Sequence, residues 1–279
     1  MVAWLALPLA VGPSLADALA GRSGPVQATA EVVAWGVWAA TLVAVLVPRT
    51  TSLTGLRIAA PLVAVAAVVA APQGGVGAAD VVSVAWAAGT LVLAMAPATG
   101  DVFVNGSSYG DERRMPLRPP AALLAGPVEL AWLAVVVPVV AAPLLLAAGA
   151  TVAGLAVALV GVPAAVVGVR ALHGLARRWV VFVPAGLVVH DLLALADPVL
   201  LTRPSIRRLG PARADEPGLD LTRGALGLAL AVELGPEPVE LPRRDGRTTT
   251  MVRTDRLLVA PTRPGALLRE AAGRHLAVG

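Results

Sequence analysis

The 279-residue sequence has no cysteine, no lysine and few aromatic residues other than its six tryptophans. Without cysteine, the chain can form no disulfide framework, thiolate nucleophile or cysteine-ligated metal site. Charge is also scarce, because charged residues make up 14% of the chain, against about 25% in an ordinary soluble domain. Hydrophobic residues make up 57% of the chain. This imbalance predicts an integral membrane protein.

Several functional classes lack their sequence signals. Most arginines behind the formal net charge of +4 have acidic residues nearby, whereas a nucleic-acid groove needs a basic stripe with stacking aromatics. The sequence has no glycine-rich phosphate loop, no Gly-x-Ser-x-Gly elbow and no paired catalytic carboxylates. His173, His190 and His275 lack the spacing of a metal site. We therefore expect no nucleic-acid partner, no catalytic residue, no cofactor and no metal.

Long apolar runs dominate residues 1–176 and predict an α-helical bundle of about six membrane spans, since about 20 apolar residues cross a bilayer. The run 130–169 has no charge and is long enough for two crossings, so it must turn once, near residues 147–150. Arg49 and Arg57 are expected to bracket the short loop before the third span. The expected spans are 2–20, 28–47, a segment within 58–79 that ends near residues 73–75, 81–96, 121–147 and 151–173.

Residues 2–20 allow a second interpretation. Small residues precede Gly21, as they do at the cleavage site of a signal peptide, but the positively charged n-region is missing. We favour an uncleaved first span.

A polar stretch at residues 101–120 holds every charged residue between Asp80 and Arg170 except Glu129. Apolar spans flank it, so it must connect them at a membrane face. Basic residues are retained on the cytoplasmic side of a membrane. With six spans, one side has only Arg22, while the other has Arg49, Arg57, Arg113, Arg114, Arg118, Arg177 and Arg178. We therefore expect a plasma-membrane protein whose N-terminus, polar loop (98–120) and C-terminal domain are cytoplasmic.

After residue 176 the pattern changes to short apolar segments separated by turn residues, which predicts a β-rich domain at 177–279. About seven strands are expected, and Asp245-Gly246 gives the strongest hairpin signal. Thr262 and Pro264 open a final helix in which Leu267 and Leu268 lie on the buried side.

This order of elements, from the hairpin segment WVVFVPAGLVVHD to the closing segment TRPGALLREAAGRH, resembles the pleckstrin-homology-like architecture. The resemblance covers residues 177–279 and implies binding of peptides, lipids or neighbouring subunits instead of catalysis. Phosphoinositide binding in that family would need a basic cluster on the first hairpin loop. That loop is Pro184-Ala185-Gly186 here.

The polar loop carries the candidate sites Tyr109, Asp111, Glu112, Arg113, Arg114 and Arg118. Adjacent acidic and basic residues at a membrane face can bind a phosphate headgroup. They can also form an ion-paired cap that orders the loop and docks the soluble domain, with Tyr109 packed against that interface. We favour the cap, because three arginines are fewer than the roughly four to eight of a lipid-binding basic cluster.

Glu129 is expected about nine residues inside the fifth span, where burying a charged carboxylate costs at least about 2.5 kcal/mol. Arg170, near the end of the sixth span, should lie at a similar depth. We expect the two residues to form an ion pair. A proton-relay acid in a small transporter is the alternative.

The sequence favours a non-enzymatic membrane protein that presents a cytoplasmic β domain for interaction or assembly. A small transporter using Glu129 and a lipid-headgroup enzyme using the loop 111–118 are the alternatives. The lipid bilayer is the expected partner, and anionic headgroups, a protein partner and a second copy of the chain remain open.

Overall fold

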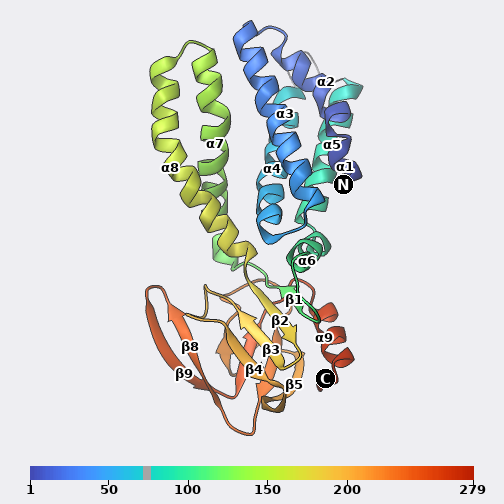
Figure 1. Ribbon diagram of the computed structural model, residues 1–279, viewed down its shortest axis with the longest axis vertical. Coiled ribbons are helices and arrows are strands. Elements are labelled where there is room, and N and C mark those ends of the chain that lie inside the picture. The colour runs from blue at the N-terminus through green and yellow to red at the C-terminus, as the bar shows by residue number, and fades with distance from the viewer. Residues whose placement is uncertain (72–76) are drawn as a thin grey trace. The chain divides into compact units, whose positions relative to one another are not determined.

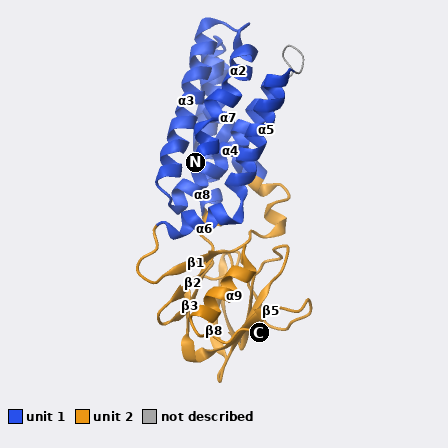
Figure 2. Cartoon of the chain, turned by 90° about the vertical axis from the view of Figure 1, so that its right-hand side faces the viewer, with its two compact units in different colours: residues 1–106, 129–173 blue, residues 107–128, 174–279 orange. Residues whose placement is uncertain are grey.

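A computed structural model describes residues 1–71 and 77–279. The chain forms two compact units, each built from two separate segments (Figure 2). The helical unit comprises Met1–Gly106 and Glu129–His173, and the β unit comprises Ser107–Val128 and Gly174–Gly279. Residues 73–75, where the third span was expected to end, lie outside the described residues.

Six helical segments are long and apolar enough to cross a membrane, as the sequence predicted. α1 and α2 form the first of these segments together, and α6 is a short helix after the fourth. The helices are α1 (Val2–Leu5), α2 (Leu7–Leu19), α3 (Gly24–Leu46), α4 (Thr50–Ala70), α5 (Ala78–Met95), α6 (Pro97–Asn105), α7 (Pro127–Ala147) and α8 (Thr151–Ala176) (Figure 1). The predicted turn at 147–150 is confirmed.

One expectation for the helical unit was wrong. Arg57 does not bracket a loop, because α4 begins at Thr50 and contains Arg57 in its interior. The connection from α3 to α4 is a few residues around Pro48, so the third span starts earlier than the apolar run suggests. The guanidinium of Arg57 lies beside α6, where its NH2 atom would be 3.1 Å from a Cβ added to Gly100.

Indole and imidazole groups connect the helices of this unit. Trp4 and Trp38 donate to each other's backbone carbonyls, at 3.0 and 3.1 Å. Trp132 of α7 donates to the Ile58 carbonyl of α4 at 2.9 Å. The Thr54 hydroxyl of α4 hydrogen-bonds to Nδ1 of His173 in α8, also at 2.9 Å. The bonds of Trp132 and His173 attach the α7–α8 hairpin to α4 at polar points within otherwise apolar helices.

Three glycines of α8 allow close packing against α7. Gly154, Gly161 and Gly168 are spaced by seven residues and therefore lie along one stripe of the helix. A Cβ at Gly154 would lie 2.7 Å from the Leu146 side chain, and one at Gly168 would lie 2.6 Å from the Ala131 carbonyl oxygen. A Cβ at Gly161 would collide with Pro138. Such small residues permit the short interhelical distances on which packing in lipid depends.

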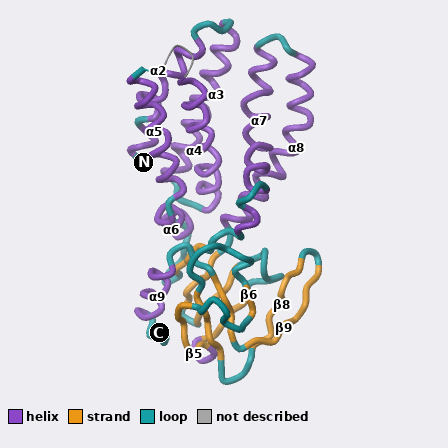
Figure 3. Tube along the Cα trace, turned by 180° about the vertical axis from the view of Figure 1, so that it is seen from behind, coloured by secondary structure: helices purple, strands orange, loops and turns teal. Residues whose placement is uncertain are grey.

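Two four-stranded sheets, a separate hairpin and the α-helix α9 make up most of the β unit (Figure 3). The first sheet has the order β1-β2-β3-β4, with all neighbours antiparallel. Its strands are β1 (Arg113–Pro116), β2 (Trp179–Val183), β3 (Gly186–His190) and β4 (Val199–Thr202). β1 comes from the polar loop that we assigned to the transmembrane domain. Its pairing with β2, from Arg113 opposite Phe182 to Pro116 opposite Trp179, places residues 107–120 of that loop in the β unit, whereas 98–106 stay in the helical unit.

The second sheet has the order β5-β7-β10-β6, in which only the β10–β6 pair is parallel. Its strands are β5 (Ile206–Pro211), β6 (Leu219–Asp220), β7 (Leu230–Leu234) and β10 (Arg256–Val259). β8 (Val239–Asp245) and β9 (Thr248–Thr254) form the hairpin that Asp245-Gly246 predicted. α9 (Pro264–Gly273) closes the unit, as expected.

A single apolar core fills this unit, with members from both sheets, the β8–β9 hairpin and α9. Phe182, Leu187, Leu209, Leu257 and Leu267 are all at least 98% buried. Leu267 is therefore buried as predicted, whereas Leu268 is only partly buried and packs against the core.

Candidate functional site

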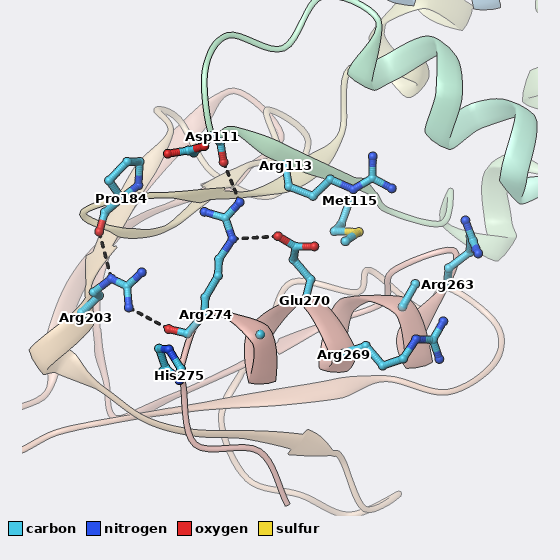
Figure 4. A pocket seen from close by; sticks show the side chains of 12 residues that line it. Asp111, Arg113, Met115, Pro184, Arg203, Arg263, Arg269, Glu270, Arg274 and His275 are labelled. Carbon is cyan, nitrogen blue, oxygen red and sulfur yellow. Dashed lines mark hydrogen bonds and ion pairs between the residues drawn. The ribbon is translucent and has the colours of Figure 1, made fainter.

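A groove of about 880 Å³ lies on the β unit beside α9 (Figure 4). Strand β1, the β2–β3 turn, the segment after β4 and one side of α9 form its walls. The lining residues are Asp111, Arg113, Met115, Pro184, Arg203, Arg263, Ala266, Arg269, Glu270, Gly273, Arg274 and His275.

The helical repeat explains why α9 presents polar side chains to the groove. Leu267 and Ala271 are four residues apart and both are buried in the core. Residues 266, 269, 270 and 273 repeat at intervals of three and four on another side, which faces the groove. On β1, the two-residue repeat directs Arg113 and Met115 to the groove and Arg114 to the opposite face.

Hydrogen bonds fix the arginines at one end of the groove. Arg274 Nε donates to Glu270 Oε1 at 2.7 Å, and its NH2 donates to the Asp111 carbonyl at 2.5 Å. Arg203 donates from Nε to the Pro184 carbonyl and from NH1 to the Arg274 carbonyl, both at 2.8 Å. The Arg274 guanidinium also stacks 5.6 Å from the Phe182 ring centroid. These contacts connect α9 to the first sheet and build a preformed wall.

The other end of the groove is different. Figure 4 shows the guanidinium groups of Arg113, Arg263 and Arg269 on the side away from the Arg203–Arg274 contacts. Arg269 is exposed, and within the described part of the chain its side chain forms neither an ion pair nor a hydrogen bond. Its NH1 atom lies close to the start of α9, 3.6 Å from where a Cβ on Gly265 would be.

The groove has an excess of positive charge, since five arginines line it against the two carboxylates Asp111 and Glu270. Arginine presents a planar fork of donors that matches the oxygens of a phosphate or carboxylate. The Glu270 carboxylate is already engaged by Arg274. The chemistry of this lining suits the binding of an anion.

The polar-loop residues of the sequence analysis have different roles. Asp111 and Arg113 line the groove. Glu112 and Arg114 form an ion pair at 3.2 Å, and the Arg114 guanidinium lies 5.5 Å from the Trp179 ring centroid. Tyr109 is 88% exposed, so its side chain is not buried in the β unit.

Arg118 lies outside the groove. Its NH1 atom donates to the carbonyls of Leu226 and Leu228, at 3.1 and 3.2 Å. Arg178, counted above as a basic residue at a span end, is 2% exposed and forms a buried ion pair with Asp191 at 2.7 Å. Arg118 and Arg178 therefore hold the β unit together.

The structure gives Glu129 and Arg170 a setting different from the buried pair that was expected. Both residues are exposed, and an ion pair between them stays a prediction. The fifth candidate span covers residues 121–147, as expected. Its first residues are not regular α-helix, because 121–123 form a short 3-10 helix and Gly126 adopts φ +139°. α7 therefore begins at Pro127, which puts Glu129 in the first helical turn. An acid in the first turn is favoured by the helix dipole.

The sequence analysis missed most of the groove, namely Arg203, Arg263, Arg269, Glu270, Arg274 and His275. One signal was present: the closing segment 262–275 carries three arginines, one in α9 and one at each of its ends, and these had to avoid the side that buries Leu267. Among the described residues, no group of three histidines or carboxylates could hold a metal ion.

Comparisons of the chain with protein-family models, with curated proteins and with solved structures found no match. Function is therefore inferred from the groove and from the six long apolar helices.

Proposed function

We propose that this chain is a non-enzymatic integral membrane protein whose β unit binds anionic phospholipid headgroups in the groove beside α9, and so serves as an interaction or assembly module. The observation that carries the proposal is the arginine-rich lining with Arg269 unengaged by the described residues.

Charge and geometry support a phosphate ligand. Charge-assisted hydrogen bonds from arginine to phosphate are about twice as strong as neutral ones. At one end of the groove, Arg274 and Arg203 are oriented by their own hydrogen bonds. They therefore contribute positive potential without having to be ordered on binding. At the other end of the groove, the unengaged side chain of Arg269 can rotate onto a ligand.

Chain connectivity supports a lipid source for that phosphate. Trp179 follows Ala176, the last residue of the membrane-spanning helix α8, by three residues. Pro116 pairs with Trp179, and the Thr262 amide donates to the Pro116 carbonyl at 2.8 Å. Two strand spacings are about 10 Å, so Arg263 lies about that far from the start of β2, which follows α8 in the chain. This supports a lipid as the source of the phosphate.

The pleckstrin-homology-like interpretation belongs to the same proposal. A strand-rich unit that ends in one helix supports it, and so does a ligand groove beside that helix. In this chain the ligand would not bind at the first hairpin loop, because Ala185 and Gly186 offer it no cation.

We further propose that the β unit is cytoplasmic, on the positive-inside argument. Arg49, Arg113, Arg114 and Arg177 still support this orientation, although Arg57 and Arg178 no longer do. The absence of cysteine makes the test direct. A cysteine at Tyr109 should resist a membrane-impermeant thiol reagent in intact cells while one at Arg22 reacts, and the reverse pattern would exclude this orientation.

Binding can be measured on the full chain in a neutral detergent by calorimetric titration with dioctanoyl phosphatidic acid. Arg269→Glu should weaken binding about tenfold or more, because a charge-assisted hydrogen bond is worth about 1.5–3 kcal/mol. Arg247→Glu is the matched control, since Arg247 is an exposed arginine on the β8–β9 turn, outside the groove.

Equal weakening by Arg269→Glu and Arg247→Glu would show that net charge alone governs binding and would exclude a groove site. A hexaglutamate peptide that binds tightly while phosphatidic acid does not would assign the groove to an acidic protein partner instead.

A further inference from the structure

The β unit exposes a second, apolar surface that the groove does not include. Leu124, Leu192, Leu193, Leu226 and Leu228 are all exposed, and Leu226 reaches 74%. They belong to three segments that are far apart in the sequence, before α7, after β3 and before β7. We call these five residues the leucine patch.

Hydrogen bonds hold the three segments against one another. Arg118 donates to the carbonyls of Leu226 and Leu228, and the Ala121 amide donates to the Gly224 carbonyl at 3.4 Å. Arg223 donates to the Leu193 carbonyl at 2.8 Å, and Arg244 donates to the Leu192 carbonyl at 3.1 Å. The backbone under the patch is therefore ordered by arginines.

A hollow of about 390 Å³ lies within this arrangement. It is lined by Pro120, Ala122, Leu123, Leu192, Leu193, Arg223, Arg244 and Gly246. Apolar side chains that surround a hollow, with guanidinium groups among them, are an unusual surface to leave in water. The same combination suits a membrane interface, where apolar side chains enter the acyl boundary and arginines reach the phosphates.

Chain continuity supports one choice of surface to cover the patch. Leu124 precedes Pro127, the first residue of the apolar helix α7, by three residues. Three extended residues reach at most about 11 Å, so Leu124 lies within about 11 Å of the start of a helix that is long and apolar enough to cross a membrane.

We propose that the leucine patch inserts into the headgroup and acyl boundary of the bilayer that α7 and α8 cross. Leu226 and Leu228 enter the lipid, and Arg223 and Arg244 lie at the level of the phosphates. The patch therefore anchors the β unit on the membrane surface, independently of any ligand in the groove.

The absence of cysteine allows a direct test on the full chain. Single cysteines replace Leu226, Leu193 or Met251, are labelled with bimane, and are reconstituted into vesicles of phosphatidylcholine and phosphatidylglycerol. Met251 is the matched control, because it is an exposed apolar residue on β9 outside the patch. Quenching by acyl-chain-brominated lipid is compared with quenching by aqueous iodide.

The proposal expects brominated lipid to quench bimane at Leu226 and Leu193 at least threefold more strongly than at Met251, with iodide giving the opposite order. Labelled variants must retain the thermal midpoint of the parent, and Leu228→Cys serves if either patch variant fails to do so. Equal iodide quenching at Leu226 and Met251 would overturn the proposal. Protection of Leu226 from both quenchers would also overturn it and assign the patch to a protein partner.

Discussion

The buried ion pair between Arg178 and Asp191 gives the sharpest prediction about stability. Arg178 donates from Nε to Asp191 Oδ1 and from NH2 to Oδ2, both at 2.7 Å, and from NH1 to the Arg118 carbonyl at 2.7 Å. Their side chains are 2% and 0% exposed. Arg178 directly precedes β2, and its bond to the Arg118 carbonyl fixes the chain two residues after the end of β1. The pair therefore supports the strand β1 that forms a wall of the groove.

Arg178→Met should destabilise the β unit by about 3–5 kcal/mol, because it leaves a buried carboxylate without its counter-charge. After this change, the Leu193 amide, at 3.1 Å, is the one donor among the described residues that still reaches the Asp191 carboxylate. A domain is stable by about 5–15 kcal/mol, so the loss is a large fraction of the total. It should lower the unfolding midpoint by roughly 10 °C.

A double-mutant cycle distinguishes the pair from a packing effect. Arg178→Met with Asp191→Leu should recover most of the lost stability, since an apolar replacement of both partners is often nearly neutral. Arg247→Met is the control for loss of an exposed arginine. The assay is thermal unfolding of the full chain in detergent, followed by tryptophan fluorescence. A midpoint unchanged by Arg178→Met, or a double variant no better than the sum of both single variants, would refute the reasoning.

The remaining predictions concern helix packing and pH. Gly161→Leu should separate α8 from α7 because its side chain meets Pro138, whereas Gly174→Leu, with open space at its Cβ, should not; equal midpoints and equal protease resistance of the two variants would contradict this packing. The hydrogen bond and charge of Arg208 lower the pKa of Glu233 from its ordinary value of 4.5. Glu233 therefore contributes stability above pH 4.5 that is lost as the pH falls through its folded pKa, so Glu233→Gln should be less stable than the parent at pH 7 and match it at low pH. A constant difference across that pH range would exclude this origin.

Much of the fold follows from local pattern. The uninterrupted apolar runs predicted the six helices, because length and hydrophobicity suffice to define a span. Short β-branched segments and Asp245-Gly246 predicted most strands and the β8–β9 hairpin. β6 was missed because it has only two residues, Leu219 and Asp220, whose parallel pairing with β10 depends entirely on tertiary structure.

Other features could not be read from local sequence. β1 has four residues, two of them arginines, and becomes a strand because it pairs with β2, from which the helices α7 and α8 separate it in the sequence. The boundary of α7 depended on the positive φ of Gly126, which moved Glu129 from an expected span interior to a first turn. The groove joins Asp111, Arg203 and Arg274 through backbone carbonyls, and no spacing in the sequence predicts such bonds.

The central claim is that the groove holds the headgroup of an anionic phospholipid. The most direct measurement is native mass spectrometry of the full chain, released from nanodiscs that contain phosphatidic acid and phosphatidylcholine in equal amounts. The wild-type chain and Arg247→Glu should retain phosphatidic acid in preference to phosphatidylcholine, and the double variant Arg263→Glu with Arg269→Glu should lose that preference. An unchanged preference in the double variant, or no preference in the wild-type chain, would contradict the claim.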